Sequence, residues 1–246
     1  VALGIGGDAT ASAIALAAAM DKSQQRATAE AWTARFKEER TAFLAQRDRD
    51  AVDADPIQPS GLFKAFRQVF PDDAAVTFDA GTLCLQCTDA LRYSGPKSLF
   101  SPLDFGLVGF SFACGLGVKL ALPERSVISL MGDGGFGMTV SELSTAVDYN
   151  INTVTVVMNN GCWGAEKAYQ RDFFDGRYIG ADVSSPPFDK LAELYGAEGY
   201  RVEKLADVAI AIEAALACGK PAVVDIAVDP NALFSFRRDS FKHRGV

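Results

Sequence analysis

Two apolar runs that each end in polar residues constrain the fold of this chain more than any other feature. Residues 126–131 run into Gly132-Asp133-Gly134, and residues 153–158 run into Asn159-Asn160. Helical spacing between them predicts a helix at about residues 139–149. A strand–helix–strand unit sets two parallel strands side by side. The carboxylate and the amides are therefore expected at one edge of a sheet, where open α/β sheets bind ligands.

Residues 132–137 also fit GxGxxG, the fingerprint of dinucleotide-binding turns. Two features argue against that interpretation. Asp133 would repel a bare pyrophosphate, and the next strand, about 20 residues on, ends in Asn159-Asn160 and lacks the acidic residue that holds a ribose. A divalent cation between Asp133 and the phosphates would remove the repulsion, and Mg²⁺ prefers oxygen ligands that it shares with phosphates. The alternative is two glycine turns in an ordinary Rossmann-like sheet.

Gly132-Asp133-Gly134 followed, after residues 135–158, by Asn159-Asn160 resembles the signature of thiamine diphosphate (ThDP) enzymes. The resemblance implies an α/β fold of three layers, a parallel Rossmann-like sheet with helices on both faces, and ThDP and Mg²⁺ as cofactors. It implies that Asp133, Asn160 and the backbone carbonyl of Cys162 bind the metal. Further cofactor contacts are expected from Gly132, Gly134, Gly135 and Trp163.

A second glycine turn follows the predicted strand at residues 75–78. It reads Asp79-Ala80-Gly81-Thr82 and leads to Leu83. Backbone N–H groups and the Thr82 hydroxyl at such a turn can face a phosphate, so we predict that Gly81, Thr82 and Leu83 contact the diphosphate. The alternative is a plain turn between a strand and a helix.

Residues 104–110 precede a predicted helix of small residues that ends near Leu122. In the resembled family the matching stretch carries a bulky apolar residue that wedges between the two cofactor rings, and Val108 occupies that position. The carbonyl of Gly106 is expected to accept a hydrogen bond from the 4′-amino group of the cofactor. The alternative is that Val108 is a core residue.

Glu166 lies in the segment that follows Asn160 and runs into a helix. By resemblance it falls where decarboxylases of the family place a carboxylate that handles substrate protons, so it is predicted to act as a general acid–base. Lys167 and Arg171 lie nearby in the sequence, and a surface ion pair with either of them is the alternative.

Three short motifs narrow the resemblance. Residues 163–167, 196–199 and 236–239 resemble sulfoacetaldehyde acetyltransferases, and the whole stretch from Pro59 resembles the acetolactate synthase group. The expected function is a ThDP-dependent transferase or lyase that cleaves or forms a C–C bond beside a carbonyl and transfers a two-carbon acyl unit. A 2-oxo acid decarboxylase and a non-catalytic ThDP- or nucleotide-binding subunit are the alternatives. Arg237 and Arg238 either bind phosphate or sulfonate or form a solvated basic tail.

The composition limits the classes of molecule that this chain can be expected to bind. The net charge of −7 argues against nucleic acid and anionic membranes, and the sequence has no apolar run long enough to span a bilayer. The sequence has five cysteines, of which Cys84 and Cys87 form a single CxxC motif, and one histidine, His243. This set favours free thiols in the cytoplasm over a zinc site. The expected substrate is a small 2-oxo acid or aldehyde, with phosphate as a candidate acceptor.

The order of segments predicts three parts. Residues 1–20, an apolar strand at 1–5 and a helix at about 10–20, are expected to end a central α/β domain. Residues 21–58 form a charged helix and linker, and residues 59–246 form the domain that binds the diphosphate and Mg²⁺. The resemblance implies that a pyrimidine-binding domain from a missing N-terminal part or another subunit completes the site. The chain alone is then inactive, and a homodimer or homotetramer is expected.

Overall fold

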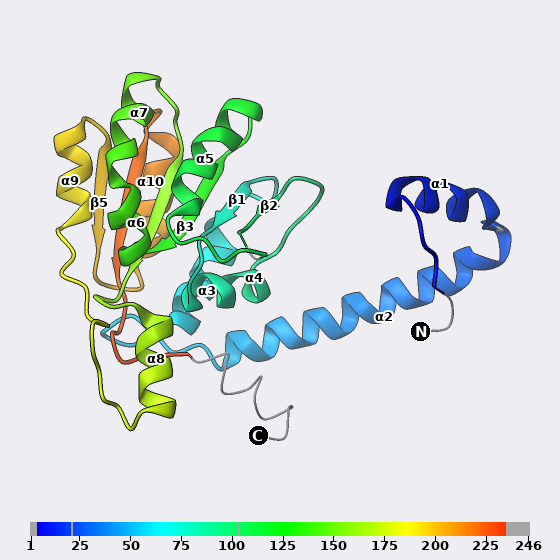
Figure 1. The fold of residues 1–246 in the computed structure, drawn as a ribbon, viewed down its shortest axis with the longest axis horizontal. Helices are drawn as coiled ribbons and strands as arrows, with labels where there is room; N and C mark the ends of the chain where they lie inside the picture. The colour runs from blue at the N-terminus through cyan, green and yellow to red at the C-terminus, as the bar shows by residue number, and fades with distance from the viewer. Residues whose placement is uncertain (1–3, 21, 103, 235–246) are drawn as a thin grey trace. The chain divides into compact units, whose positions relative to one another are not determined.

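The computed structural model describes residues 4–20, 22–102 and 104–234, which form two units, Val1–Arg49 and Asp50–Val246 (Figure 1). The smaller unit contains helices α1 (Ala9–Ala19) and α2 (Lys22–Arg49). Asp8 caps α1 by accepting a hydrogen bond from Ala11 N at 2.8 Å. Of the strand predicted at residues 1–5, residues 1–3 lie outside the described part, and Gly4 and Ile5 are not in a strand. None of the described helices has the length and apolar character needed to cross a membrane.

The larger unit is built on a fully parallel sheet with the strand order β2-β1-β3-β4-β6-β5. The strands are β1 (Ala75–Phe78), β2 (Leu99–Phe100), β3 (Val127–Gly132), β4 (Val154–Asn159), β5 (Glu198–Val202) and β6 (Ala222–Ala227). The strand order reverses between β1 and β3, because the chain goes from β1 out to β2 and then returns to β3 on the other side of β1. The carboxyl ends of these central strands are where a doubly wound sheet opens a crevice.

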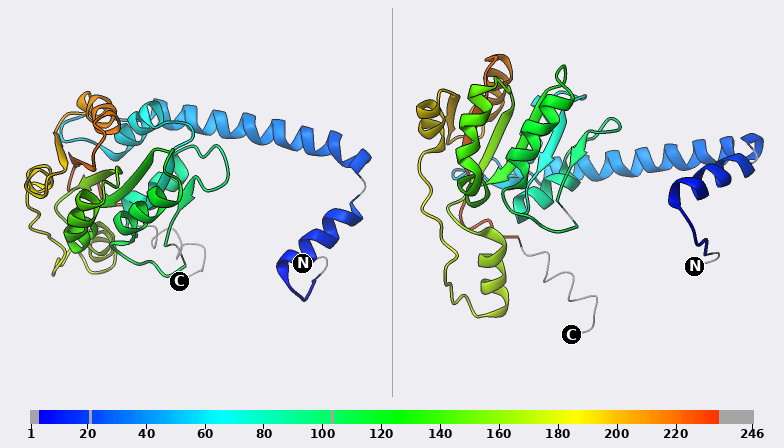
Figure 2. Two further views of the ribbon diagram at one scale, coloured as in Figure 1. Left: turned by 90° about the horizontal axis from the view of Figure 1, so that it is seen from above. Right: turned by 45° about the horizontal axis from the view of Figure 1, so that its top comes forward.

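Helices cover both faces of the sheet, as predicted (Figure 2). One face carries α3 (Pro59–Val69), α4 (Thr82–Ala90) and α10 (Asp207–Ala217). The other carries α5 (Phe110–Ala121), α6 (Asp133–Thr139), α7 (Leu143–Asp148) and α9 (Phe188–Tyr195). Helix α8 (Gly164–Phe173) follows β4.

The central strands are buried on both sides because their side chains alternate between two cores. In β4, Val156 and Met158 belong to the core beneath α3, α4 and α10, whereas Val157 belongs to the core beneath α5, α6 and α9. Parallel strands covered by helices on both faces carry such near-continuous apolar runs. The three-layer α/β prediction is confirmed.

The structure has one helix that was not predicted. The helix expected at about residues 139–149 corresponds to a short 3-10 turn at Val140–Glu142 followed by α7, whereas α6, which begins at Asp133, was not expected. Glycines disfavour helix, but Phe136 is fully buried and packs edge-on against Phe112 and Phe188, which holds the glycine-rich turn in helical form. Within residues 21–58, predicted as a charged helix and linker, α2 is helical to Arg49 and the linker follows it, with Ile57 already paired with Val228.

Candidate functional site

A cavity of about 420 Å³ lies at the carboxyl ends of β1, β3 and β4. Every residue that the sequence analysis proposed for cofactor, metal or proton transfer lines it. These residues are Gly81, Thr82, Leu83, Gly106, Val108, Gly132, Asp133, Gly134, Gly135, Asn160, Cys162, Trp163 and Glu166. The structure thus brings segments that are far apart in the sequence to one place, while their individual roles stay predictions.

The three proposed metal ligands meet at the centre of this cavity. One end of the Asn160 amide lies next to Oδ1 of Asp133 and the carbonyl oxygen of Cys162, so the three groups meet. Without a cation the amide nitrogen occupies that end and donates to both oxygens, at 3.3 Å and 3.0 Å. A cation bound there would instead require the amide oxygen at that end, which a rotation of the amide by 180° provides. The donor set therefore fits a divalent cation that prefers oxygen ligands.

Asp133 is a buried carboxylate that accepts hydrogen bonds from its surroundings. It is 1% exposed, and Ser185 Oγ donates to its Oδ2 at 2.8 Å. Burial raises the pKa of Asp133 above its ordinary value, against the opposing effect of the Ser185 hydrogen bond. A bound cation would favour the charged form of such a group.

The described residues hold no cluster of three or more His, Cys, Asp or Glu side chains suited to a metal. The proposed ligands are one carboxylate, one amide and one backbone carbonyl. Phosphate oxygens supplied by a cofactor would have to complete the coordination, as is common for Mg²⁺.

Backbone turns at the starts of three helices surround the same space. Helix α4 begins at Thr82 after Gly81, α6 begins at Asp133, and α8 begins at Gly164. A Cβ built on Gly164 would stand 3.3 Å from both Thr82 Oγ1 and Asn160 Nδ2, so the turns before α4 and α8 pack closely. Backbone N–H groups at helix starts favour anions, which is the chemistry that a diphosphate needs.

The Gly106 turn forms another wall of the cavity. Gly106 has φ of +72°, and its N–H donates to the carbonyl of Pro102 at 2.6 Å. Val108 is half-buried and lines both this cavity and a neighbouring apolar hollow. Phe105, three residues before Val108 in the sequence, is 87% exposed.

Glu166 lies at the exposed rim of the cavity on the first turn of α8. The two basic residues that could have neutralised it have other partners. Lys167 Nζ lies 2.6 Å from Asp182 Oδ1, and Arg171 Nε lies 2.7 Å from Asp172 Oδ1. The proposed surface ion pair of Glu166 is therefore absent from the described residues, and a role toward a ligand stays open to it.

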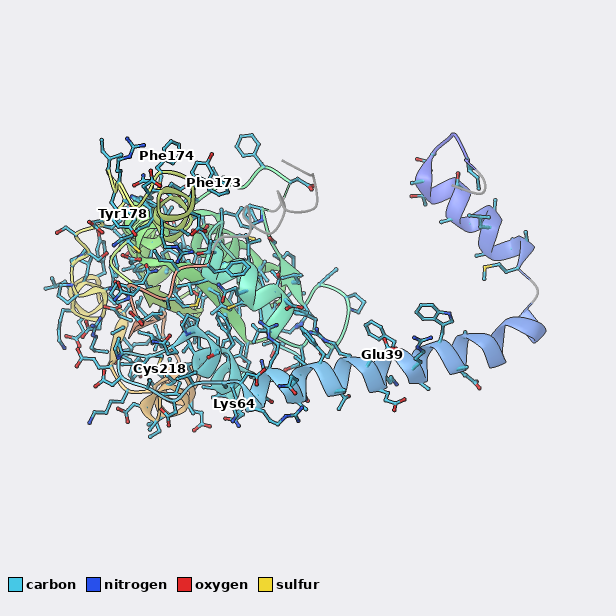
Figure 3. All side chains as sticks on the ribbon, turned by 90° about the horizontal axis from the view of Figure 1, so that it is seen from below. Glu39, Lys64, Phe173, Phe174, Tyr178 and Cys218 are labelled. Atoms are coloured by element: carbon cyan, nitrogen blue, oxygen red, sulfur yellow. The ribbon has the colours of Figure 1, made fainter. Side chains whose placement is uncertain are left out.

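Aromatic side chains pack against one another at the end of α8, the helix that carries Glu166. Tyr169 packs against Phe173 and Phe174, with ring centroids 4.8 Å and 5.5 Å away. Lys167 Nζ lies 5.5 Å from the ring centre of Tyr178. Figure 3 labels Phe173, Phe174 and Tyr178 on α8 and the segment after it.

The cavity also contains residues that the site prediction missed, namely Asp79, Ala80, Cys84, Leu85, Pro102, Gly164 and Ala165. Cys84 is fully buried, and burial with the nearby Asp79 charge raises the pKa of its thiol to about 12. Asp79 belongs to the glycine turn at residues 79–82, but no role was predicted for it because its hydrogen bonds come from Gly109 and Ser111, about 30 residues later in the chain. Arg237 and Arg238 lie outside the described residues.

Comparisons with known proteins point to one family. Residues 79–226 match the C-terminal TPP-binding domain of thiamine pyrophosphate enzymes. Sulfoacetaldehyde acetyltransferase of Alcaligenes xylosoxydans xylosoxydans is 31% identical over 246 residues, covering 96% of this chain and 40% of that protein. A probable acetolactate synthase large subunit of Methanococcus aeolicus is 32% identical over 186 residues, covering 73% of this chain and 31% of that protein.

A solved structure agrees with these matches. The thiamine diphosphate-dependent 4-hydroxybenzoylformate decarboxylase of Rhodococcus jostii RHA1 superposes with a TM-score of 0.68 at 31% identity, over 74% of this chain and 34% of that one. The chain spans less than half the length of these relatives.

Proposed function

The chain belongs to the family of thiamine pyrophosphate enzymes, and we propose that it binds the diphosphate end of ThDP through Mg²⁺ as part of an enzyme that transfers a two-carbon acyl unit. The observation that carries this proposal is the meeting of Asp133, Asn160 and the Cys162 carbonyl within the matched domain. Bound ThDP would supply the stabilised carbanion needed to break or form a bond beside a carbonyl.

This chain's own residues bind, orient and shield in the proposed reaction. Asp133, Asn160 and the Cys162 carbonyl would hold Mg²⁺, while the turns at Gly81 and Gly132 would present N–H groups to the phosphates. Glu166, at the rim of the cavity, would give or take a substrate proton. The proposed substrates are a small 2-oxo acid or aldehyde, with phosphate or a second carbonyl compound as acceptor.

A pyrimidine-binding domain, from a longer polypeptide or from another subunit, completes the site in this proposal. Phe105 and Leu107, which precede Val108 in the sequence, have exposed apolar side chains, and Leu107 lines the apolar hollow next to the cavity. Exposed apolar side chains of this kind support the proposal, because they are typical of a surface that a partner covers. A homodimer or homotetramer in the cytoplasm is the proposed assembly.

The cofactor assignment is tested by thermal unfolding with ThDP, with Mg²⁺, and with both. We expect a stabilising shift only with both present. Asp133→Ala should abolish the shift because it removes the charged ligand, and Asn160→Ala should weaken it less. Asp104→Asn, which removes an exposed carboxylate from the same domain, is the matched control. A shift that survives Asp133→Ala unchanged would refute the metal assignment.

A second candidate reaction is simple decarboxylation of a 2-oxo acid, which the structural likeness to a decarboxylase favours. The assembled enzyme can be incubated with pyruvate or sulfoacetaldehyde, with and without phosphate, and its products identified by mass spectrometry. An acetylated acceptor supports acyl transfer, whereas an aldehyde alone supports decarboxylation. Cofactor binding without any product would support a non-catalytic subunit.

A further inference from the structure

Asp79 lies where three segments of the site meet. It follows β1, is 3% exposed and lines the main cavity. Its Oδ2 accepts a hydrogen bond from Gly109 N at 3.0 Å, and its Oδ1 accepts one from Ser111 N at 3.3 Å. Both N–H groups belong to the start of α5, so a carboxylate from the end of a neighbouring strand caps this helix.

The same carboxylate is pressed against the start of α6. A Cβ built on Gly135 would overlap Oδ2 of Asp79 and would stand 3.4 Å from Val108 Cγ1. Gly109, with φ of +87°, is equally confined, because a Cβ there would stand 2.9 Å from Thr139 Cγ2. Three parts of the chain therefore pack tightly against one another, namely the Asp79 carboxylate, the turn at Gly109 and helix α6. A shift of one of them would move the other two.

We propose that Asp79 is a positioning residue that fixes Val108 and the turn at residues 106–109 against the cavity, without binding the cofactor or the metal itself. The effect on the cofactor rests on the proposed function, whereas the clamp is a property of the chain alone. Both carboxylate oxygens already accept N–H groups of α5, and a free carboxylate facing a diphosphate would be repelled by it.

The electrostatics agree with this geometry. Burial raises the pKa of Asp79, and the backbone N–H groups of Gly109 and Ser111 oppose that rise by favouring the charged form. Because the Asp79 carboxylate accepts the N–H groups at the start of α5, those N–H groups are already occupied by an anionic side chain and do not bind phosphate. The N–H groups that face phosphate must then come from the turns before α4, α6 and α8.

A second set of contacts keeps the start of α5 in place when Asp79 is altered. Ser111 Oγ donates to the carbonyl oxygen of Thr77 at 2.9 Å, and the carbonyl oxygen of Ser111 accepts a hydrogen bond from Ser129 Oγ at 3.3 Å. Asp79→Asn is therefore expected to fold. It replaces one of the two acceptors by an NH₂ group and so opposes one of the two N–H donors.

The first experiment uses the full chain without cofactor. Hydrogen–deuterium exchange is measured for peptides that cover residues 104–112 in the wild type, Asp79→Asn and the exposed control Asp104→Asn. We expect exchange at Gly109 and Ser111 to rise at least about tenfold in Asp79→Asn and to stay unchanged in Asp104→Asn. Equal exchange in the wild type and Asp79→Asn overturns the clamp.

The second experiment adds ThDP and Mg²⁺ and follows the fluorescence of Trp163 in a Trp32→Phe background, which leaves one tryptophan. Asp79→Asn should change the affinity by less than about threefold, whereas Asp133→Asn should weaken it more than about tenfold. The near-ultraviolet circular dichroism of the bound cofactor, which reports how its rings are held, should change in Asp79→Asn and not in Asp104→Asn.

The outcomes separate the two proposals. An affinity loss in Asp79→Asn as large as in Asp133→Asn would make Asp79 a ligand and overturn the inference, as would an unchanged dichroism spectrum. Failure of the wild-type chain to bind ThDP would contradict the proposed function. The exchange experiment would still decide whether Asp79 holds the turn.

Discussion

The indole ring of Trp163 lies so close to Gly134 that a Cβ built on this glycine would stand 2.6 Å from Trp163 Cζ3. Both residues line the main cavity. Gly134 follows the proposed ligand Asp133, and Trp163 follows the proposed ligand Cys162. The contact therefore joins the two segments that carry the metal site, and it exists only because position 134 has no side chain.

Gly134→Ala should displace the ring and open the metal site. We expect a loss of about 1–3 kcal/mol in the free energy of unfolding, typical of overpacking, together with clearly weaker ThDP binding. Gly137→Ala in the same helix is the matched control, since its Cβ would stand 3.9 Å from Phe188 Cζ. Urea unfolding and a ThDP titration measure both effects. Wild-type affinity in Gly134→Ala would show that the ring is free to move.

A second glycine makes the contact between α5 and the sheet. A Cβ on Gly115 would overlap Ser129 Oγ, which is fixed by the hydrogen bond from Thr77. Gly115→Ala is therefore expected to lose about 1–3 kcal/mol of unfolding free energy. Gly117→Ala, two residues along, has open space and should gain up to about 1 kcal/mol from helix propensity. Urea unfolding measures both.

A double-mutant cycle sharpens this prediction. Ser129→Ala removes the hydroxyl and leaves Ser129 Cβ at 3.5 Å from the added methyl, an ordinary contact. Ser129→Ala should then cost less in the Gly115→Ala background than in the wild type. Strict additivity of the two changes would mean that the overlap is relieved by a movement of the whole helix.

How far the sequence predicts this fold depends on the range of the interactions. Residues 75–78 were predicted as a strand and form β1, because apolar and β-branched residues end at a turn of Asp and Gly. Helix α9 ends at Tyr195, where Gly196 adopts φ of +93° and closes it, as a glycine after a helix predicts. In both cases the residues that decide the structure are neighbours in the sequence.

The missed features depend on distant contacts. The start of α6 at Asp133 follows from the packing of Phe136 between Phe112 and Phe188, which glycine propensities do not reveal. Strand β2 has two residues and exists through pairing with β1. For the candidate site, the motifs and the family resemblance predicted many of the residues that line the cavity, but not Asp79. The contacts of Asp79 with the start of α5 needed the structure.

The proposed third metal ligand is a backbone carbonyl, which makes a clear prediction for Cys162. This side chain is 4% exposed, and burial raises the pKa of its thiol to about 11, so the thiol is neutral at pH 7. Cys162→Ser should leave the Mg²⁺ concentration required for ThDP binding within about threefold of wild type. A Mg²⁺ titration at fixed ThDP measures this. A collapse in affinity would assign the ligand to the sulfur.

Asp225 offers a test of buried charge away from the cavity. It is fully buried in β6, accepts a hydrogen bond from Asn159 Nδ2 at 3.0 Å and lies 2.9 Å from Arg201 Nη1. Burial raises the pKa of Asp225, although Asn159 and Arg201 both oppose the shift. Asp225→Asn removes the attraction to the exposed Arg201 and one of the acceptors that Asn159 Nδ2 and Phe188 N use inside the sheet, so it is expected to lower stability at pH 7.

The pH dependence of that loss has a definite sign. Because the pKa of Asp225 is higher in the folded chain than its ordinary value of 3.8, the folded state binds the proton more tightly. The stability of the wild type relative to Asp225→Asn should therefore rise as the pH falls from 7 toward 4, and be lost again as the pH rises through the folded pKa. Asp229 is the control with the opposite sign. Its pKa is lowered, mainly by the hydrogen bond from Asn231 N and then by the one from Gln58. The stability of the wild type relative to Asp229→Asn should therefore fall as the pH falls. Urea unfolding at several pH values measures both differences, and equal slopes for the two variants would contradict the assignment of charge to these sites.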